Sequence, residues 1–237
     1  MPSATPVIVS WSGGKDSALA LHALRQDAAY HVVGLLTSVN AHYGRISMHG
    51  VREALLEEQA ASIGLPLYRV KLSQRPPNNE YEQKMRAALE GFKADGIRHV
   101  AFGDLFLEDI RGYRVKNMQQ AQMQCVFPLW RRPTDKLARE FIALGFKAVL
   151  CCVDEQALSG KFAGREYDVA LLKELPPGVD ACGENGEFHT FVYEGPVFQC
   201  PIAFTRGACV RRDNRFRFCD LIPMEKEHEH LATNAYG

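Results

Sequence analysis

The chain has 237 residues, of which 46% are hydrophobic and 24% charged, and its 28 basic and 28 acidic side chains give a net charge of zero. This composition is ordinary for a soluble globular protein, and the balanced charge gives no general reason for a membrane or a nucleic acid to bind. The seven cysteines form no CxxC pair, and the N-terminus lacks the basic region and long apolar run of a signal peptide. We therefore expect a cytoplasmic protein with reduced cysteines and with no membrane or nucleic-acid partner.

Short apolar runs alternate with helical patterns through the first half of the chain. The runs predict buried strands at Val7–Trp11, His31–Ser38, Leu67–Leu72 and His99–Asp104, and the patterns predict helices at Asp16–Gln26, Gly50–Ile63 and Glu80–Asp95. Strands that alternate with helices form right-handed crossovers around a mainly parallel sheet. We therefore expect an open α/β domain over residues 1–127.

The pattern changes near residue 128. A helix is expected from about Thr134 up to Gly145, and a strand at Lys147–Asp154. Beyond residue 178 the chain reads as hairpins, with strands at Phe188–Tyr193, Pro196–Phe204 and Arg215–Ile222. We expect a smaller α+β domain over residues 128–224 and a disordered tail over residues 225–237. The basic stretch at 211–217 is interpreted as solvated surface.

The stretch "SWSGGKDS" at Ser10–Ser17, here called the glycine loop, joins the first strand to the first helix. Its two glycines let backbone N–H groups turn toward a bound oxyanion, and the helix adds its positive N-terminal end. Ser12 and Ser17 supply hydroxyl groups, and Lys15 supplies a positive charge. A structural turn capped by serine is the alternative, but the whole pattern favours an anion cradle. The predicted nucleotide-binding residues are Ser10, Ser12, Gly13, Gly14, Lys15, Asp16 and Ser17.

The spacing of "SGGKDS" fits neither GxxxxGK[ST] nor GxGxxG, and it resembles the PP-loop of the ATP pyrophosphatases, whose sheet is Rossmann-like and of the HUP type. The resemblance implies that ATP is cleaved to AMP and pyrophosphate and that the loop holds the leaving pyrophosphate. It implies catalytic roles for Lys15 and Asp16, with Asp16 also holding Mg²⁺.

Further stretches resemble the diphthine–ammonia ligase family, in which an adenylated carboxylate is amidated by ammonia. They are "GLPLY" at 64–68, "FGDLFLEDIRGYR" at 102–114, "FPLW" at 127–130, "DACGENGEFHTFV" at 180–192 and "GPVF" at 195–198. The resemblance extends from about residue 7 to residue 204 and implies an ATP-dependent amide ligase. Asn185 stands where the family has Gly, His189 where it has Glu, and Lys116 where it has an acid. This form looks like a bacterial branch, and the acceptor, a small molecule or a protein side chain, is left open.

The stretch "CGENGEFHT" at Cys182–Thr190, here called the acidic block, is the first candidate substrate site. Glu184 and Glu187 place two carboxylates around a glycine bend, where they can hold a cationic group such as ammonium, and Cys182 and His189 add a nucleophile or a base. A structural turn with two exposed acids is the alternative. We expect the acidic block to close over the glycine loop, with Glu184 and Glu187 catalytic and Cys182, Glu184, Asn185, Glu187 and His189 binding the substrate.

The second candidate site is Asp104, Arg111 and Arg114, which follow the end of a predicted strand. Open α/β sheets bind ligands at this edge, although a charged helix start explains the same residues. His49, before the second helix, is interpreted as a packing or capping residue rather than a catalyst, although it could approach the nucleotide. Two other functions stay open: a thiolation enzyme in which a cysteine such as Cys182 carries sulfur, and an ATP- or AMP-binding module without turnover. The sequence does not decide between a monomer and a homo-oligomer.

Overall fold

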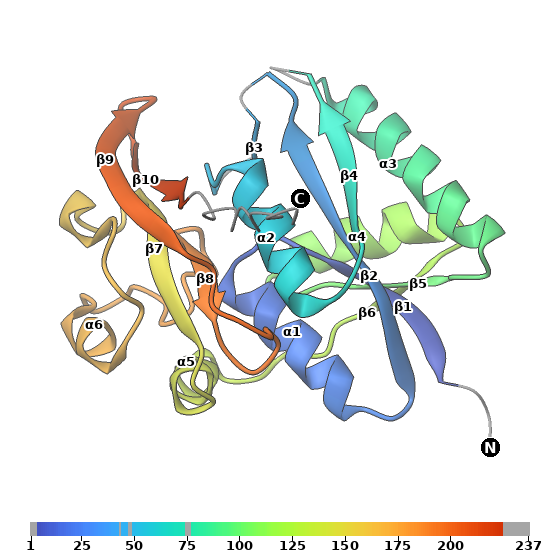
Figure 1. Ribbon diagram of the computed structural model, residues 1–237, viewed down its shortest axis with the longest axis horizontal. Helices are drawn as coiled ribbons and strands as arrows, with labels where there is room; N and C mark the ends of the chain where they lie inside the picture. Colours follow the sequence, from blue (N-terminus) through green and yellow to red (C-terminus); the bar gives the residue numbers. More distant parts are fainter. Residues whose placement is uncertain (1–3, 43, 47–48, 74–76, 225–237) are drawn as a thin grey trace, which may run out of the picture.

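The computed structural model describes residues 4–42, 44–46, 49–73 and 77–224. Two sheets lie side by side, sheet A from the first half of the chain and sheet B from the second (Figure 1). The predicted tail at 225–237 lies outside the described residues. The predicted boundary at residues 127 and 128 falls in the connection that leads out of sheet A, and we keep the division into two domains as a proposal.

Sheet A has the strand order β3-β2-β1-β5-β6, with β4 also paired to β2. Its strands are β1 (Thr5–Ser10), β2 (Tyr30–Asn40), β3 (Arg45–Ile46), β4 (Leu67–Leu72), β5 (His99–Ala101) and β6 (Gln124–Val126). All of these pairings are parallel except that of β2 with β3. The expected open, mainly parallel α/β sheet is therefore confirmed. From β1 the chain adds β2 and β4 on one side of the sheet and then β5 and β6 on the other. The order of the strands therefore reverses between β1 and β5, which is where such sheets bind ligands.

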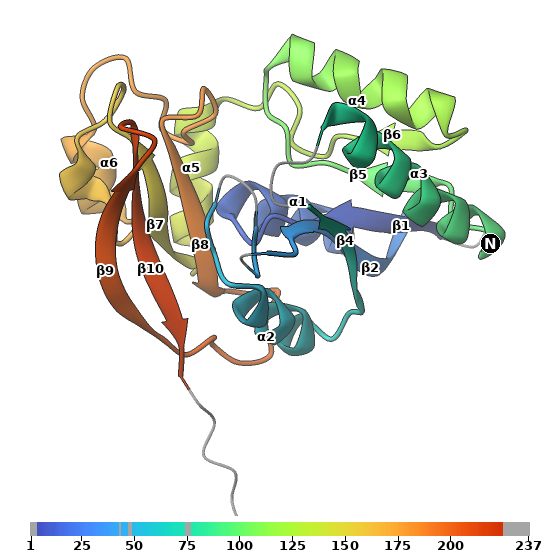
Figure 2. The ribbon, with the colours of Figure 1, turned by 90° about the horizontal axis from the view of Figure 1, so that it is seen from above.

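Helices cover both faces of sheet A. The helices α1 (Lys15–Gln26) and α2 (Glu53–Ile63) pack on the same apolar cluster as sheet B, whereas α3 (Asn78–Ala94) and α4 (Glu108–Gln120) pack on a separate cluster. Figure 2 shows α3 and α4 together on one side of the sheet. The helix α4 is absent from the sequence prediction because Met118 is its one buried residue, so it shows no apolar periodicity.

Sheet B is antiparallel, with the strand order β8-β7-β10-β9. Its strands are β7 (Lys147–Asp154), β8 (Phe188–Glu194), β9 (Phe204–Arg212) and β10 (Phe216–Pro223), and the flanking helices are α5 (Thr134–Ala143), η1 (Gly160–Phe162) and α6 (Val169–Glu174). The smaller C-terminal α+β part is thus confirmed. The strand predicted at Pro196–Phe204 is wrong: residues 195–203 are irregular, because Pro196 and Pro201 have no N–H group to donate to a ladder.

The apolar core joins the two sheets. Leu21 of α1 and Leu55 of α2 belong to the same buried cluster as Phe141 of α5 and Phe191 of β8, and all four are completely shielded from solvent. Each such side chain stabilises the fold by about 1.5–3 kcal/mol relative to an exposed one. The shared core therefore fixes sheet B against the α1 face of sheet A.

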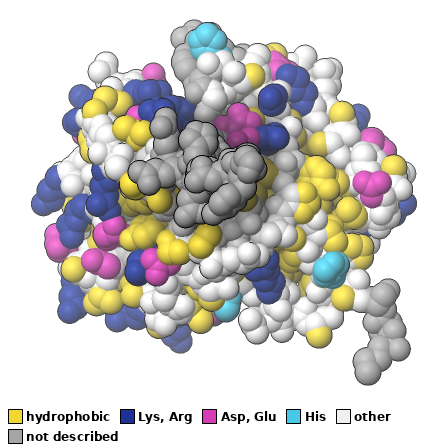
Figure 3. All heavy atoms as spheres, viewed as in Figure 1, with side chains coloured by type: hydrophobic (Ala, Val, Ile, Leu, Met, Phe, Trp, Pro, Cys, Tyr) yellow, Lys and Arg dark blue, Asp and Glu magenta, His cyan; other side chains and the backbone are white. Residues whose placement is uncertain are grey.

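The outer surface of sheet B is rich in arginine. Figure 3 shows Lys and Arg side chains spread over this side of the molecule. Arg211 and Arg217 both pair with Glu155, and Arg215 pairs with Asp154. The basic stretch is therefore largely neutralised by its neighbours. Within the described ranges, no helix has both the length and the apolar character needed to cross a membrane.

Candidate active site

The glycine loop lies where β1 ends and α1 begins. Gly13 has φ +76°, and a Cβ atom there would lie 2.9 Å from Oε1 of Gln59, so both the backbone conformation and the space require glycine. Gly14 is the last residue before α1, whose first N–H groups have no partner within the helix. The predicted strand–loop–helix arrangement is present, and its role as an anion cradle stays a prediction.

The acidic block lies directly against the glycine loop. The backbone N–H of Lys15 donates to Oγ1 of Thr190 at 3.0 Å, and the N–H of Val192 donates to the carbonyl of Gly13 at 2.9 Å. Gln59 of α2 donates to the carbonyls of Gly13 and Val192 and accepts from the Trp11 indole. The two segments, about 175 residues apart in the chain, therefore form one structure.

A cavity of about 240 Å³ lies between them. The first half of the chain lines it with Ser10, Ser12, Lys15, Asp16, Ser17, His49, Phe102, Gly103, Asp104 and Arg114, and the second half with Gly183, Glu184, Gly186, Phe188, His189 and Thr190. Most of the predicted nucleotide-binding residues thus face the same space as Glu184 and His189. Gly13 and Gly14 shape the loop and do not line the cavity.

Lys15 and Asp16 form a close ion pair in this wall. The Lys15 ammonium lies 2.8 Å from both carboxylate oxygens of Asp16 and is almost completely buried, whereas the Asp16 side chain is 30% exposed. Burial by itself lowers the pKa of Lys15, but the charges of Asp16, Cys182 and Glu184 raise it above its ordinary value. Lys15 is therefore a permanent cation beside the loop, and Asp16 presents its carboxylate to the cavity.

Glu184 is the one acid of the acidic block that reaches the cavity. Its Oε1 accepts a hydrogen bond of 2.8 Å from the backbone N–H of Leu105, in the connection between β5 and α4. Burial raises the pKa of Glu184 to about 7, and that hydrogen bond opposes the rise. A carboxyl group that titrates near neutral pH is suited to accept or release a proton.

The other polar side chains of the acidic block hold its turn together. Oε1 of Glu187 accepts from the backbone N–H of Asp180 at 2.9 Å and from Nδ2 of Asn185 at 3.0 Å. The Cys182 thiol donates to the carbonyl of Thr134 at 3.3 Å, and burial raises its pKa to about 12. None of these three side chains lines the cavity, and their predicted catalytic and binding roles stay predictions.

The residues after β5 are divided between two environments. Asp104 and Arg114 both line the cavity and form an ion pair, with Nε of Arg114 2.5 Å from Oδ2 of Asp104. Arg111 instead lies against the rings of Phe127 and Trp130, at about 5 Å from each centroid. The structure therefore brings Asp104 and Arg114 into the site and leaves Arg111 outside it.

His49 lies in the cavity, although the sequence interpretation favoured a packing or capping role for it. Its Nδ1 is 3.3 Å from the carbonyl oxygen of Thr190, and its ring lies against that of His189 with the two planes tilted. Thr190 was missed as a site residue. His49 follows the antiparallel strand β3 and precedes α2, so its place before a helix was the available signal.

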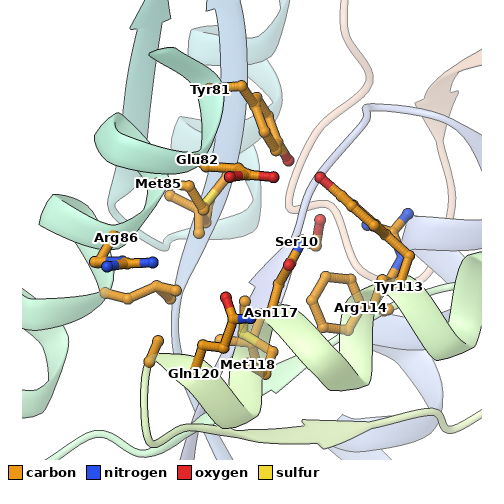
Figure 4. Close-up of a pocket in the computed structure, with 15 residues that line it drawn as sticks. Ser10, Tyr81, Glu82, Met85, Arg86, Tyr113, Arg114, Asn117, Met118 and Gln120 are labelled. Carbon is orange, nitrogen blue, oxygen red and sulfur yellow. The ribbon is translucent and has the colours of Figure 1, made fainter. Parts of the chain in front are cut away.

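An apolar cleft opens beside the cavity and shares Ser10, Phe102 and Arg114 with it. In Figure 4, Tyr81 of α3 and Tyr113 of α4 point toward one another across this cleft. Leu36, Met85, Leu89, Val100 and Met118 supply its apolar lining, and Glu82, Arg86, Asn117 and Gln120 its polar groups. A mostly apolar cleft with a few polar groups is typical of a site for a flat organic ring.

Comparison with known proteins agrees with this geometry. The model of the diphthamide synthase N-terminal domain matches residues 5–119, and that of the diphthamide synthase C-terminal domain matches residues 133–216. The chain belongs to the diphthamide synthase family. The two matched segments of this family supply the two walls of the cavity, and the relationship inferred from the sequence motifs is confirmed.

Relatives with an assigned name are similar over most of their length. A diphthine–ammonia ligase of Danio rerio is 28% identical over an alignment of 250 residues, covering 94% of this chain and 95% of the relative. The diphthine–ammonia ligases of Rattus norvegicus and Homo sapiens are 26% and 25% identical and cover 84% and 79% of the chain, and 82% and 78% of the relatives. The assignment to a bacterial branch stays a prediction.

Proposed function

We propose that the protein is an ATP-dependent ligase that adenylates a carboxylate and transfers the acyl group to ammonia. In the first step an acceptor oxygen forms a bond to the α-phosphorus of ATP, and pyrophosphate leaves with the electron pair of the broken P–O bond. In the second step ammonia attacks the acyl carbon, AMP leaves, and the nitrogen releases a proton. The observation that carries the proposal is the single cavity lined by the glycine loop and by Glu184.

The glycine loop supports the first step. Lys15 is a fixed positive charge, and Ser12, Ser17 and the first turn of α1 add hydrogen-bond donors to the same wall. These groups favour negative charge where the pyrophosphate develops it. The apolar cleft between α3 and α4 supports a position for the adenine ring, because it joins the cavity beside Ser10.

Asp16 fits a role in holding Mg²⁺. Its carboxylate lines the cavity and is partly exposed, although Lys15 contacts both oxygens. Among the described residues no three candidate ligands gather, but Mg²⁺ is commonly bound by one or two carboxylates together with phosphate oxygens and water. The ion supplies positive charge that stabilises the departing pyrophosphate.

Glu184 supports the second step. An ammonium ion has no lone pair, so it must lose a proton before nitrogen can attack the acyl carbon. The Glu184 carboxylate, with a pKa of about 7, can take that proton at neutral pH. Its contact with the Leu105 N–H fixes one oxygen, so that the other is available to the nitrogen.

The acceptor is a carboxylate of a small molecule or of a protein side chain. The relatives are named for diphthine. Of the three residues that differ from the family pattern, Asn185 and His189 lie in the acidic block and Lys116 lies in α4. We therefore do not transfer diphthine itself to this chain. Burial and the raised pKa of Cys182 disfavour the thiolate that a sulfur-carrying thiolation enzyme needs, which supports the amide ligase over that alternative.

The test is to incubate the full chain with ATP, Mg²⁺ and ammonium, with and without candidate carboxylate acceptors, and to separate the nucleotides by chromatography. We expect AMP and pyrophosphate whose formation depends on the acceptor. ADP as the main product would contradict the proposal. Binding of ATP with no nucleotide cleavage across a cell-extract acceptor library would favour the binding module.

A further inference from the structure

Two histidine side chains in the cavity have no part in the steps above. His49 precedes α2, and His189 lies in β8, yet their ring centroids are 4.6 Å apart and the ring planes are tilted by 32°. Both side chains line the cavity together with Ser12, Lys15 and Ser17 of the glycine loop. The pair therefore stands on the wall that the nucleotide phosphates would meet.

The hydrogen bonding of the pair is incomplete. The carbonyl of Thr190 can only accept, so Nδ1 of His49 carries the hydrogen and Nε2 of the neutral ring has the free lone pair. Nε2 of His189 is buried and has no hydrogen-bond partner among the described residues. Buried polar atoms in proteins are nearly always paired, so an unpaired ring nitrogen beside a cavity indicates a ligand atom or a water molecule.

The second sheet holds His49 in place. Phe218 of β10 packs so closely on Gly50 that a Cβ atom there would lie 2.7 Å from the ring. Asp220 of the same strand pairs with Arg45 and Arg52, which flank the His49 segment, and Arg45 also donates to the Gly50 carbonyl at 2.6 Å. A ring fixed in this way is ready to bind without first being ordered.

Binding of a polyphosphate adds several negative charges to the groups that surround the histidine pair. The titratable groups near it are Lys15 and Asp16 on α1, Asp104 and Arg114 across the cavity, Glu184 in the acidic block, and Cys152 in β7, which lies opposite His189 in the ladder. Burial and the Lys15 cation lower the pKa of His189 to about 4, and burial, His189 and Lys15 hold that of His49 well below its ordinary value. Each nearby anionic charge raises a pKa by about 1–3 units, so several phosphate charges favour an imidazolium.

We propose that the His49–His189 pair is a proton-coupled polyphosphate site, in which His189 takes up one proton from solvent when the nucleotide binds and donates it as a hydrogen bond to a non-bridging phosphate oxygen. The proton returns to solvent when pyrophosphate leaves, so the one bond made and then broken at the ring is the N–H bond. The inference rests on the proposed function, because it assigns the phosphates to this cavity.

The test is isothermal titration of the full chain with inorganic pyrophosphate at pH 6.5, in buffers of different ionisation enthalpy. The slope of the heat against that enthalpy counts the protons taken up, and the His189→Asn variant removes the part due to pyrophosphate itself. We expect wild type to take up about 0.3–1 proton more than the variant, and the variant to bind about 10- to 100-fold more weakly. The control, His31→Asn, changes an exposed histidine at the start of β2 and is expected to match wild type.

A second measurement uses wild type alone, so a variant that fails to fold does not block the test. The histidine Cε1–H resonances are followed by NMR against pH, with and without pyrophosphate, and one buried histidine is expected to acquire a pKa at least one unit higher. Equal proton uptake in wild type and His189→Asn, or unmoved histidine titrations, would overturn the inference and leave the ligase proposal standing. If pyrophosphate and ATP both fail to bind, the ligase proposal and the inference fall together.

Discussion

The glycine loop and the acidic block face the same cavity but are built on different principles. In the glycine loop the backbone and the start of α1 create the binding surface, and its two charged residues, Lys15 and Asp16, neutralise each other. In the acidic block most polar side chains are used to hold the turn, and Glu184 alone of its acids enters the cavity. A local motif thus encodes a backbone shape well, whereas it does not determine which of its side chains enter the site.

The largest expected effect comes from the permanent cation of the glycine loop. Lys15→Met is expected to lower kcat/KM for AMP formation by about 10²–10³-fold, because it removes a buried charge aimed at the developing pyrophosphate. Steady-state assays measure this, and Lys147→Met, at an exposed pair with Glu194, is the matched control.

Lys15→Met leaves the partly exposed Asp16 carboxylate without its partner, so stability must be measured alongside the rate. Removing one partner of a fully buried pair costs about 3–5 kcal/mol, and solvent access to Asp16 lowers that cost. The double variant Lys15→Met/Asp16→Asn keeps the shape without either charge. Wild-type turnover by a folded double variant would contradict a role of the glycine loop in AMP formation.

Glu184→Gln tests the chemical half of the comparison. We expect about 10²-fold less acceptor-dependent AMP formation, with ATP affinity changed less than about threefold, because a general base is lost and the phosphate wall is kept. Glu194→Gln, on the surface, is the matched control. Equal losses in ATP binding and in turnover would show that Glu184 belongs to the nucleotide site instead.

The pH profile sharpens the same prediction. Glu184 is protonated below about pH 7 and cannot then accept a proton, so the wild-type rate is expected to fall about tenfold per unit below that pH. Glu184→Gln is expected to lose this acid limb. An unchanged limb in the variant would assign the titration to another group.

Glu187→Gln separates the two acids of the block. Both Asp180 and Asn185 donate to Oε1, whereas Oε2 is buried with no hydrogen-bond partner among the described residues. The amide variant keeps the two bonds but buries an NH2 group with no acceptor, and is expected to lower the free energy of unfolding by about 1–3 kcal/mol. Urea denaturation measures this. A turnover loss as large as that of Glu184→Gln in a stable protein would support the catalytic role predicted from the sequence.

The smallest expected effect concerns the cleft between α3 and α4. Asn117→Trp fills this cleft and is expected to raise the KM for ATP about tenfold, which is about 1.4 kcal/mol. Gln119→Trp, on the exposed side of the same helix, is the control. If both variants keep the wild-type KM, the adenine ring lies elsewhere.

The first half of the fold was predictable because its signals are local. Apolar runs gave β1, β2, β4 and β5 of sheet A, whereas the short strands β3 and β6 were not predicted. The glycines marked a turn in which Gly13 has a positive φ. The helix α4 and the irregular stretch at 195–203 were not found, since one lacks a buried stripe and the other carries strand-like residues between prolines.

The site was predictable only where function follows from backbone shape. Glu184 and Glu187 are equivalent in sequence, and their different positions result from the turn that Asp180 and Asn185 stabilise around Glu187. His49 enters the site through long-range contacts with Phe218 and Asp220, about 170 residues away, which no local pattern contains.

The Gln59 side chain couples the unfolding of the two halves of the molecule. Its amide bonds simultaneously to Trp11, to Gly13 and to Val192, and it is completely buried. Only the bond to Val192 crosses between the halves, and pulling them apart would leave the Val192 carbonyl and a Gln59 N–H unpaired, each at a cost of about 1–3 kcal/mol while it stays buried. Calorimetry should therefore record one melting transition rather than two, and the Lys15 and Val192 amides should exchange with solvent at the same slow rate. We therefore expect the site beside the glycine loop to be preformed, so that a ligand enters it without the two halves of the molecule closing on it.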